Sequence, residues 1–143
     1  MRGAEEFVDS NVLLYLLSGD AARADAAERV LARSPRLSVQ VLNEVVQVAL
    51  RKFGMPMADV RVFSRSLRSI CEIAPLSVAM HERALGLVER SKLPLYDALI
   101  VSAALECSCR TLWSEDFQDG QVFGGSLTIR NPFASGSWGR AAR

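Results

Sequence analysis

The sequence predicts an α/β fold with a central, mainly parallel sheet of about five short strands flanked by helices. Short apolar segments alternate along the chain with longer segments of helical periodicity, which is typical of this class. The 143 residues are half apolar and 23% charged, enough for one domain with a sizeable core. In such sheets ligands bind beyond the carboxyl ends of the strands, so we expect the functional side chains there.

The first part of the chain is expected to form one strand and two helices. The apolar segment 5–8 predicts a buried strand, after which Ser10 stands where a helix N-cap is expected. An apolar run then continues to Leu17. Apolar residues recur at helical spacing within 20–33, and Pro35 stops that helix.

The middle of the chain is expected to continue the alternation. Segment 37–39 is either a short strand or the start of a long buried helix over 38–54. A further helix begins near Met57 and carries one apolar stripe as far as Ile70. Segment 71–76 predicts a strand, although Pro75 interrupts it.

The last part of the chain is expected to add two helices and two strands. Helical patterns cover 77–91 and then 94–105, where Pro94 occupies a favourable first position. Strands are predicted at 110–114 and 127–130, with a Gly-Gly turn at 124–125 before the second. We expect one domain over 1–134 and a flexible tail over 135–143.

The composition argues against several classes of function. The net charge of +1 gives no global basic field, although a local groove could still be basic. A single histidine, and three cysteines without C-x2-C spacing, argue against zinc or haem chemistry and suggest reduced thiols. We find no signal-peptide pattern and no apolar run long enough to span a membrane, so we expect a cytoplasmic location without membrane association.

Three carboxylates stand alone in segments that are otherwise apolar. Asp9 is the only charge between Phe7 and Ser18, Glu44 the only one in 38–50, and Asp97 the only one in 93–105. A buried carboxylate without a partner costs several kcal/mol or shifts its pKa until it is neutral. No Arg or Lys lies in these segments, so a shared cation is the best explanation. Oxygen ligands alone favour a hard ion, Mg²⁺ or Mn²⁺.

Further polar residues follow the predicted strands. Glu115, Asp116 and Asp119 come after strand 110–114, although an acidic turn would look the same. Ser10 and Asn11 place a hydroxyl and an amide directly after Asp9, where they could support it.

The sequence resembles PIN-domain ribonucleases, most of all VapC-like toxins of bacterial type II toxin–antitoxin systems. Segment 7–15 (Phe-Val-Asp-Ser-Asn-Val-Leu-Leu-Tyr) is similar to their first motif, and segment 38–44 to their second, with its helical Glu. Segments 96–105 and 112–116 are similar to the third and fourth motifs. Order and spacing agree over about 5–133.

The resemblance implies a PIN-like, three-layer domain and a Mg²⁺- or Mn²⁺-dependent endoribonuclease. It makes Asp9, Glu44, Asp97 and Asp116 the catalytic, metal-binding acids, with Asp119 a less certain fifth. Ser10 would orient Asp9 or a water, and the role of Glu115 stays open. It also implies an RNA substrate, a small cognate antitoxin as partner and a homodimer.

A ribonuclease also needs cationic side chains that bind the phosphate backbone of its substrate. Arg51 and Lys52 end the helix that carries Glu44, and Lys92 precedes the helix that carries Asp97, so these cations could contact phosphates. Each alone is more often a solvated surface residue. Tyr96 and Trp113 could stack on bases, but they more often pack in a core.

Two other functions remain open from the sequence. A HAD-like phosphatase also uses an Asp after a strand, but it needs a second Asp two residues later, where this chain has Asn11. A PIN-fold module that binds RNA or protein without turnover is the stronger alternative, although the retained acids argue against it.

Overall fold

A computed structural model describes residues 5–138, in which helices cover both faces of a six-stranded sheet. The strand order is β3-β2-β1-β4-β6-β5. All neighbours pair in parallel except β5, which is antiparallel to β6. The strands are β1 (Glu6–Val8), β2 (Arg36–Ser38), β3 (Glu72–Ala74), β4 (Thr111–Trp113), β5 (Val122–Phe123) and β6 (Leu127–Arg130).

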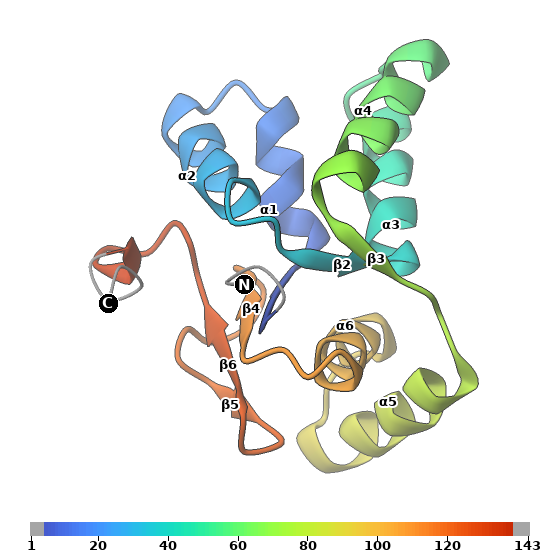
Figure 1. Ribbon diagram of the computed structural model, residues 1–143, viewed down its shortest axis with the longest axis vertical. Helices are drawn as coiled ribbons and strands as arrows, with labels where there is room; N and C mark the ends of the chain where they lie inside the picture. The colour runs from blue at the N-terminus through green and yellow to red at the C-terminus, as the bar shows by residue number, and fades with distance from the viewer. Residues whose placement is uncertain (1–4, 139–143) are drawn as a thin grey trace.

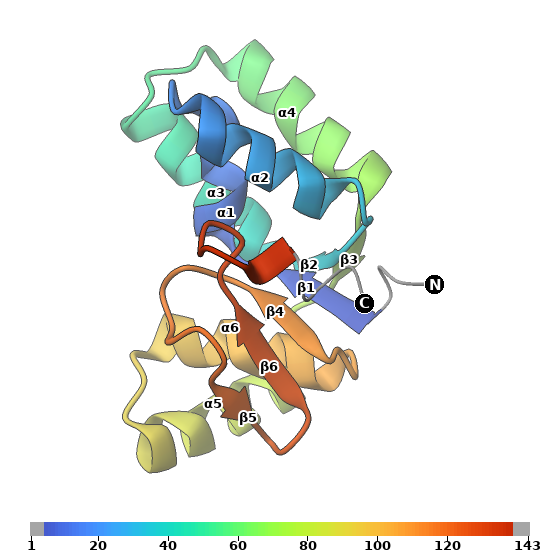
Figure 2. The same cartoon turned by 90° about the vertical axis from the view of Figure 1, so that its left-hand side faces the viewer.

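The helices form the two outer layers of a three-layer molecule (Figures 1 and 2). One side of the sheet carries α1, α2, α3 and α4, and the other carries α5 and α6. Among the described residues, no helix is both long and apolar enough to cross a membrane. The helices are α1 (Ser10–Leu14), the 3₁₀ turn η2 (Tyr15–Leu17), α2 (Ala21–Leu31), α3 (Val39–Arg51), α4 (Met57–Ile70), α5 (Val78–Ser91) and α6 (Leu95–Glu106).

The core lies where the central strands meet the helices. Phe7 and Val8 of β1 and Leu112 of β4 are fully buried, as expected for strands covered on both faces. Helix α6 packs mainly against α5, and its Ala98 and Ala104 are inaccessible to solvent.

Local signals explain most of the helix boundaries. Ser38 and Ser77 cap α3 and α5, each accepting a hydrogen bond from the backbone N–H three residues on. The prediction that Ser10 caps α1 is wrong, because the cap is Asp9, whose carboxylate accepts from the Ser10 N–H at 2.7 Å. A carboxylate at this position also lies at the positive end of the helix dipole.

The sheet has one strand more than the five that were predicted. β5 is only two residues long, too short to show a period in the sequence. It forms a hairpin with β6 through Gly124 and Gly125, both with positive φ, as the predicted turn requires.

The chain returns to the core after β6. In the described part of the expected tail, Trp138 stacks on Trp113 with ring centroids 4.9 Å apart, and the Arg29 guanidinium lies 4.2 Å from the Trp138 ring centroid. Residues 1–4 and 139–143, which belong to the expected domain and tail, lie outside the described residues.

Candidate functional site

The site is built around the buried carboxylate of Asp9, directly after β1. The Asp9 N–H donates to the Trp113 carbonyl at 2.9 Å, which continues the pairing of β1 with β4 and fixes the backbone. One carboxylate oxygen accepts from the Ser10 N–H at 2.7 Å. The other accepts from the Ser114 hydroxyl at 2.8 Å and the Asn11 amide at 3.3 Å. Neutral donors therefore surround a side chain that is 3% exposed.

Glu44 lies on α3, and both of its carboxylate oxygens accept hydrogen bonds. One accepts from the Ser10 hydroxyl at 2.8 Å, and the other accepts from the Gln40 amide at 3.0 Å. The same Gln40 amide donates to the Tyr96 carbonyl at 3.1 Å, at the start of α6. Ser10 thus joins α1 to α3, and Gln40 joins α3 to the helix that carries Asp97.

Asp97 and Asp116 complete the group. Asp97 lies half-buried in the first turn of α6, and Asp116 is exposed in the loop after β4. The Asp116 N–H donates to the Ser114 hydroxyl at 3.1 Å, so Ser114 contacts both the loop and Asp9. The structure brings these four predicted acids, from four separate segments, into one electrostatic neighbourhood.

The electrostatics of the group favour uncharged acids or a bound cation. Desolvation raises the pKa of Asp9 to about 7, with the charges of Asp116 and Glu44 adding to it and hydrogen bonds from Ser114 and Ser10 opposing it. Burial also raises the pKa of Asp97, again with help from Asp116 and Glu44. No ion pair within residues 5–138 involves any of these four carboxylates.

This donor set fits a hard divalent cation by its chemistry. Carboxylate oxygens with no nearby histidine or thiolate are the ligands that Mg²⁺ and Mn²⁺ prefer, and a cation would relieve the mutual repulsion. Within residues 5–138, no group of three His, Cys, Asp or Glu is yet positioned to hold a metal ion.

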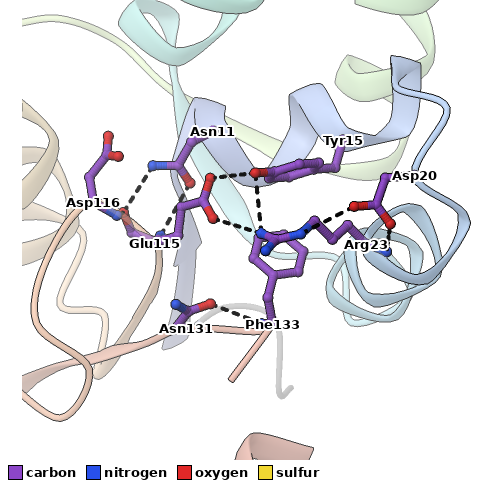
Figure 3. Close-up of polar contacts among 9 residues, drawn as sticks. Asn11, Tyr15, Asp20, Arg23, Glu115, Asp116, Asn131 and Phe133 are labelled. Carbon is purple, nitrogen blue, oxygen red and sulfur yellow. Dashed lines mark hydrogen bonds and ion pairs between the residues drawn. The ribbon is translucent and has the colours of Figure 1, made fainter. Parts of the chain in front are cut away.

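The side chain of Glu115 points towards Tyr15 and Arg23, as Figure 3 shows. Its carboxylate accepts from the Tyr15 hydroxyl at 2.8 Å and pairs with the Arg23 guanidinium at 3.1 Å. Its N–H donates to the Asn11 side-chain oxygen at 3.3 Å. The hydrogen bond to Glu115 is the main reason why the pKa of Tyr15 is raised. The neighbouring side chain of Asp116 points in another direction (Figure 3).

Asp119 makes a different contact. It is exposed, and its carboxylate accepts from the Asn131 N–H at 2.8 Å, on the segment that follows β6. Its charge is not among those that shift the pKa of Asp9 or Asp97.

Sequence reasoning missed three side chains of the site. Ser114 is a fully buried hydroxyl at the end of β4, and Gln40 lies one helical turn before Glu44. A polar residue at the end of an apolar strand was the available signal for Ser114. Arg23, which lies on α2, carried no comparable signal because arginine is common on exposed helix faces.

The candidate RNA-contacting side chains are exposed. Arg51 and Lys52 lie at the end of α3, where Lys52 lines a cavity of about 280 Å³ together with Asn11 and Glu115. Lys92 lies just after α5. Trp113 is buried, as expected, whereas Tyr96 is 66% exposed, so the expectation that it packs in the core is wrong. Ala98 and its neighbours fill the inner face of α6 and leave Tyr96 outside.

Comparison with known proteins identifies the family. The model of the PIN domain matches residues 7–118, and none of the curated proteins matches the chain. A toxin–antitoxin complex from Klebsiella pneumoniae is 24% identical and superposes with a TM-score of 0.69 over 89% of this chain and 97% of that one.

Two further solved structures share the fold. VapC20 from Mycobacterium tuberculosis, a toxin that cleaves the sarcin-ricin loop, is 20% identical, with a TM-score of 0.64 over 78% of this chain and 91% of its own. VapBC2 from Rickettsia felis, bound to a DNA fragment of its promoter, is 16% identical, with a TM-score of 0.65 over 88% and 97%. The match to the PIN model covers well over half of the sequence and spans Asp9 to Asp116. The chain therefore belongs to the PIN-domain family.

Proposed function

We propose that the protein is a divalent-metal-dependent endoribonuclease that hydrolyses RNA phosphodiester bonds as the toxin of a toxin–antitoxin pair. The observation that carries the proposal is the buried carboxylate of Asp9, whose pKa the charges of Asp116 and Glu44 raise and which forms no ion pair within residues 5–138. The fold likeness to VapC20, a toxin that cleaves the sarcin-ricin loop, supports RNA as the substrate.

The chain's own residues hold and orient the acids. Asp9, Glu44, Asp97 and Asp116 would bind Mg²⁺ or Mn²⁺, which supplies Lewis-acid polarisation of the phosphodiester and lowers the pKa of a water. Ser114 and Asn11 keep Asp9 aimed into the group. A protonated Asp9 has to release its proton before it can act as a ligand.

These acids would support hydrolysis of a phosphodiester. A water loses a proton and attacks the phosphorus in line, the bond to the 3′ oxygen breaks, that oxygen takes up a proton, and a 5′-phosphate remains on the other product. Arg51, Lys52 and Lys92 would contact backbone phosphates of the RNA. No histidine is required, and the chain's single histidine, His81, is exposed on α5.

The test is cleavage of a mixed RNA pool by the purified protein in Mg²⁺, Mn²⁺ or EDTA. We expect metal-dependent cleavage by the wild type and a loss of at least about 100-fold in Asp9→Asn and Asp97→Asn, because each removes a ligand. Asp25→Asn, an exposed acid on α2, is the matched control and should cut normally. Cleavage that survives both site substitutions would contradict the assignment. A wild type that never cuts would favour the binding module without turnover.

The expected partner is a small cognate antitoxin, and the expected location is the cytoplasm. The likeness to a toxin–antitoxin complex and to a VapBC pair supports such a partner. Expression of the chain alone should arrest growth, and co-expression of the antitoxin encoded beside it should restore growth. If Asp9→Asn arrests growth as strongly as the wild type, the arrest does not come from RNA cleavage.

A further inference from the structure

A second feature lies beside the acidic group. A cavity of about 660 Å³ opens between α3, the β3–α5 connection, α5 and α6, and we call it the Tyr96 cavity. Glu44 belongs to both the acidic group and the cavity lining. Gln40 lies at the shared edge, where its amide bonds both Glu44 and the Tyr96 carbonyl. A ligand in the cavity would therefore extend to the acids.

The lining combines an apolar surface with uncharged polar groups. Val48, Met80 and Leu99 supply apolar atoms, while Asn43 and Gln47 supply amides. Among the described residues that line the cavity there is no Lys or Arg, Glu44 is the only carboxylate, and His81 is the one imidazole. A phosphate would meet the Glu44 carboxylate and no Lys or Arg, which disfavours it here. A nucleobase has apolar faces and polar edges, and amide side chains commonly bond such edges. The volume also lies in the range typical of small-molecule sites.

Tyr96 gives the cavity an exposed aromatic ring. The side chain is 66% exposed and directly precedes Asp97. Its hydroxyl makes no hydrogen bond within residues 5–138, and its ring packs against no other aromatic ring there. Leaving a large ring in water beside an acidic group stabilises the fold little, whereas such rings stack well on bases of single-stranded RNA.

We propose that the Tyr96 cavity is a nucleobase subsite that holds one unstacked base of the RNA next to the bond that is cut. Tyr96 is the stacking surface, and the amides of Asn43 and Gln47 contact the base edge. The proposal rests on the proposed nuclease function. It makes Tyr96 a specificity-determining residue, because the base in the cavity fixes which phosphodiester reaches Asp97 and Glu44.

The experiment compares Tyr96→Leu, Tyr96→Phe and Leu95→Ala with the wild type. An unstructured RNA pool of mixed sequence is cut in Mg²⁺ or Mn²⁺, and the ends are sequenced to give base preference at each position beside the cut. KM and kcat are then measured on one preferred oligonucleotide. Leu95 is the matched control because it is 40% exposed in the same helical turn and does not line the cavity.

The expected result is specific to one base position. Tyr96→Leu should lose the preference at that position and raise KM by roughly 5- to 100-fold, the range that base–aromatic stacking accounts for, with kcat less affected. Tyr96→Phe should keep the base preference and the wild-type KM, because the ring is retained. Leu95→Ala should match the wild type. All variants should melt like the wild type, since both residues are exposed.

Three other outcomes would overturn the proposal. If the wild type cuts RNA and Tyr96→Leu has the same base preference and KM, the subsite is wrong while the nuclease function stands. If the wild type cuts no RNA, both fail together. If Tyr96→Leu and Leu95→Ala both lower the sedimentation coefficient without changing base preference, this face contacts a second copy of the chain.

Discussion

The carboxylate of Asp9 is held in an environment that favours its protonated form. In the unfolded chain this group titrates near 3.8, whereas burial raises its pKa in the folded protein to about 7. Between about pH 4 and 7 the folded state therefore binds a proton that the unfolded state has released. By linkage, the stability of the metal-free protein falls as pH rises through this window.

This gives a prediction for Asp9→Asn, which removes the buried charge. In EDTA at pH 8 we expect its free energy of unfolding to exceed that of the wild type by roughly 1–3 kcal/mol, with the gain disappearing near pH 4. Urea denaturation at pH 4, 6 and 8 measures it, and Asp25→Asn should show no such trend. A variant that is less stable than the wild type at pH 8 would show that the hydrogen bonds of Asp9 outweigh its desolvation.

Glu115 and Asp116 are adjacent in sequence but have different surroundings. Glu115 contacts Tyr15 and Arg23, whereas Asp116 shifts the pKa of Asp9. We expect Asp116→Asn to reduce RNA cleavage by at least about 100-fold and Glu115→Gln by less than about 10-fold, below the roughly 10- to 100-fold loss typical of a residue that supports a metal ligand. Initial rates on one RNA substrate measure both. Equal losses would place Glu115 among the ligands.

At the scale of single elements, the helices follow from their periodicity and capping residues, but β5 does not. A two-residue strand depends on its partner, and β5 exists because the Gly124-Gly125 turn folds it back onto β6. The N-cap of α1 also depends on a neighbouring strand. Both Asp9 and Ser10 can cap a helix, and Asp9 does so because its N–H is already paired with β4.

The first residue of β1, Glu6, forms a buried ion pair with Arg33. Glu6, 6% exposed, accepts hydrogen bonds from the Arg33 guanidinium after α2 and from the Trp113 indole N–H of β4 at 3.0 Å. Sequence patterns did not single out this pair. The three side chains tie β1, β4 and the end of α2 together.

Two neighbouring glutamates give a matched test of this pair. Glu6→Ala leaves Arg33 partly buried without its partner, so we expect a loss of about 3–5 kcal/mol in unfolding free energy. Glu5→Ala breaks only an exposed pair with Arg110 and should cost less than about 1 kcal/mol. Chemical denaturation of the two variants measures the difference. Similar losses would mean that burial of the Glu6 pair adds nothing.

For the whole molecule, the fold explains how residues far apart in sequence form one site. Parallel strands β1 and β4 are neighbours, so their carboxyl ends place Asp9 and Ser114 within one hydrogen bond although 105 residues separate them. Helix α3 contributes Glu44 from one face of the sheet, and α6 contributes Asp97 from the other (Figure 1).

A homodimer is expected from the resemblance to VapC-like toxins. Val78 and Leu85 are exposed by 78% and 45% and lie seven residues apart on one stripe of α5, so a second copy could cover them. We expect a dimer in sedimentation velocity at micromolar concentration, and a monomer after Val78→Asp. Val62→Asp, which changes an exposed valine on α4, is the control. A wild type that sediments only as a monomer would contradict the expectation.

The sequence by itself determined the α/β class and most helix boundaries, and it predicted Asp9, Glu44 and Asp97 as site residues, whereas Asp116 was predicted from the family resemblance. The first predictions follow from local physical causes: periodicity, caps, and the cost of a lone charge in an apolar segment. Only the tertiary structure decided that Glu115 contacts Arg23 while Asp116 raises the pKa of Asp9, that Ser114 and Gln40 hold the acids, and that Tyr96 stays in solvent. Those outcomes depend on contacts between distant segments, whose geometry no local pattern encodes.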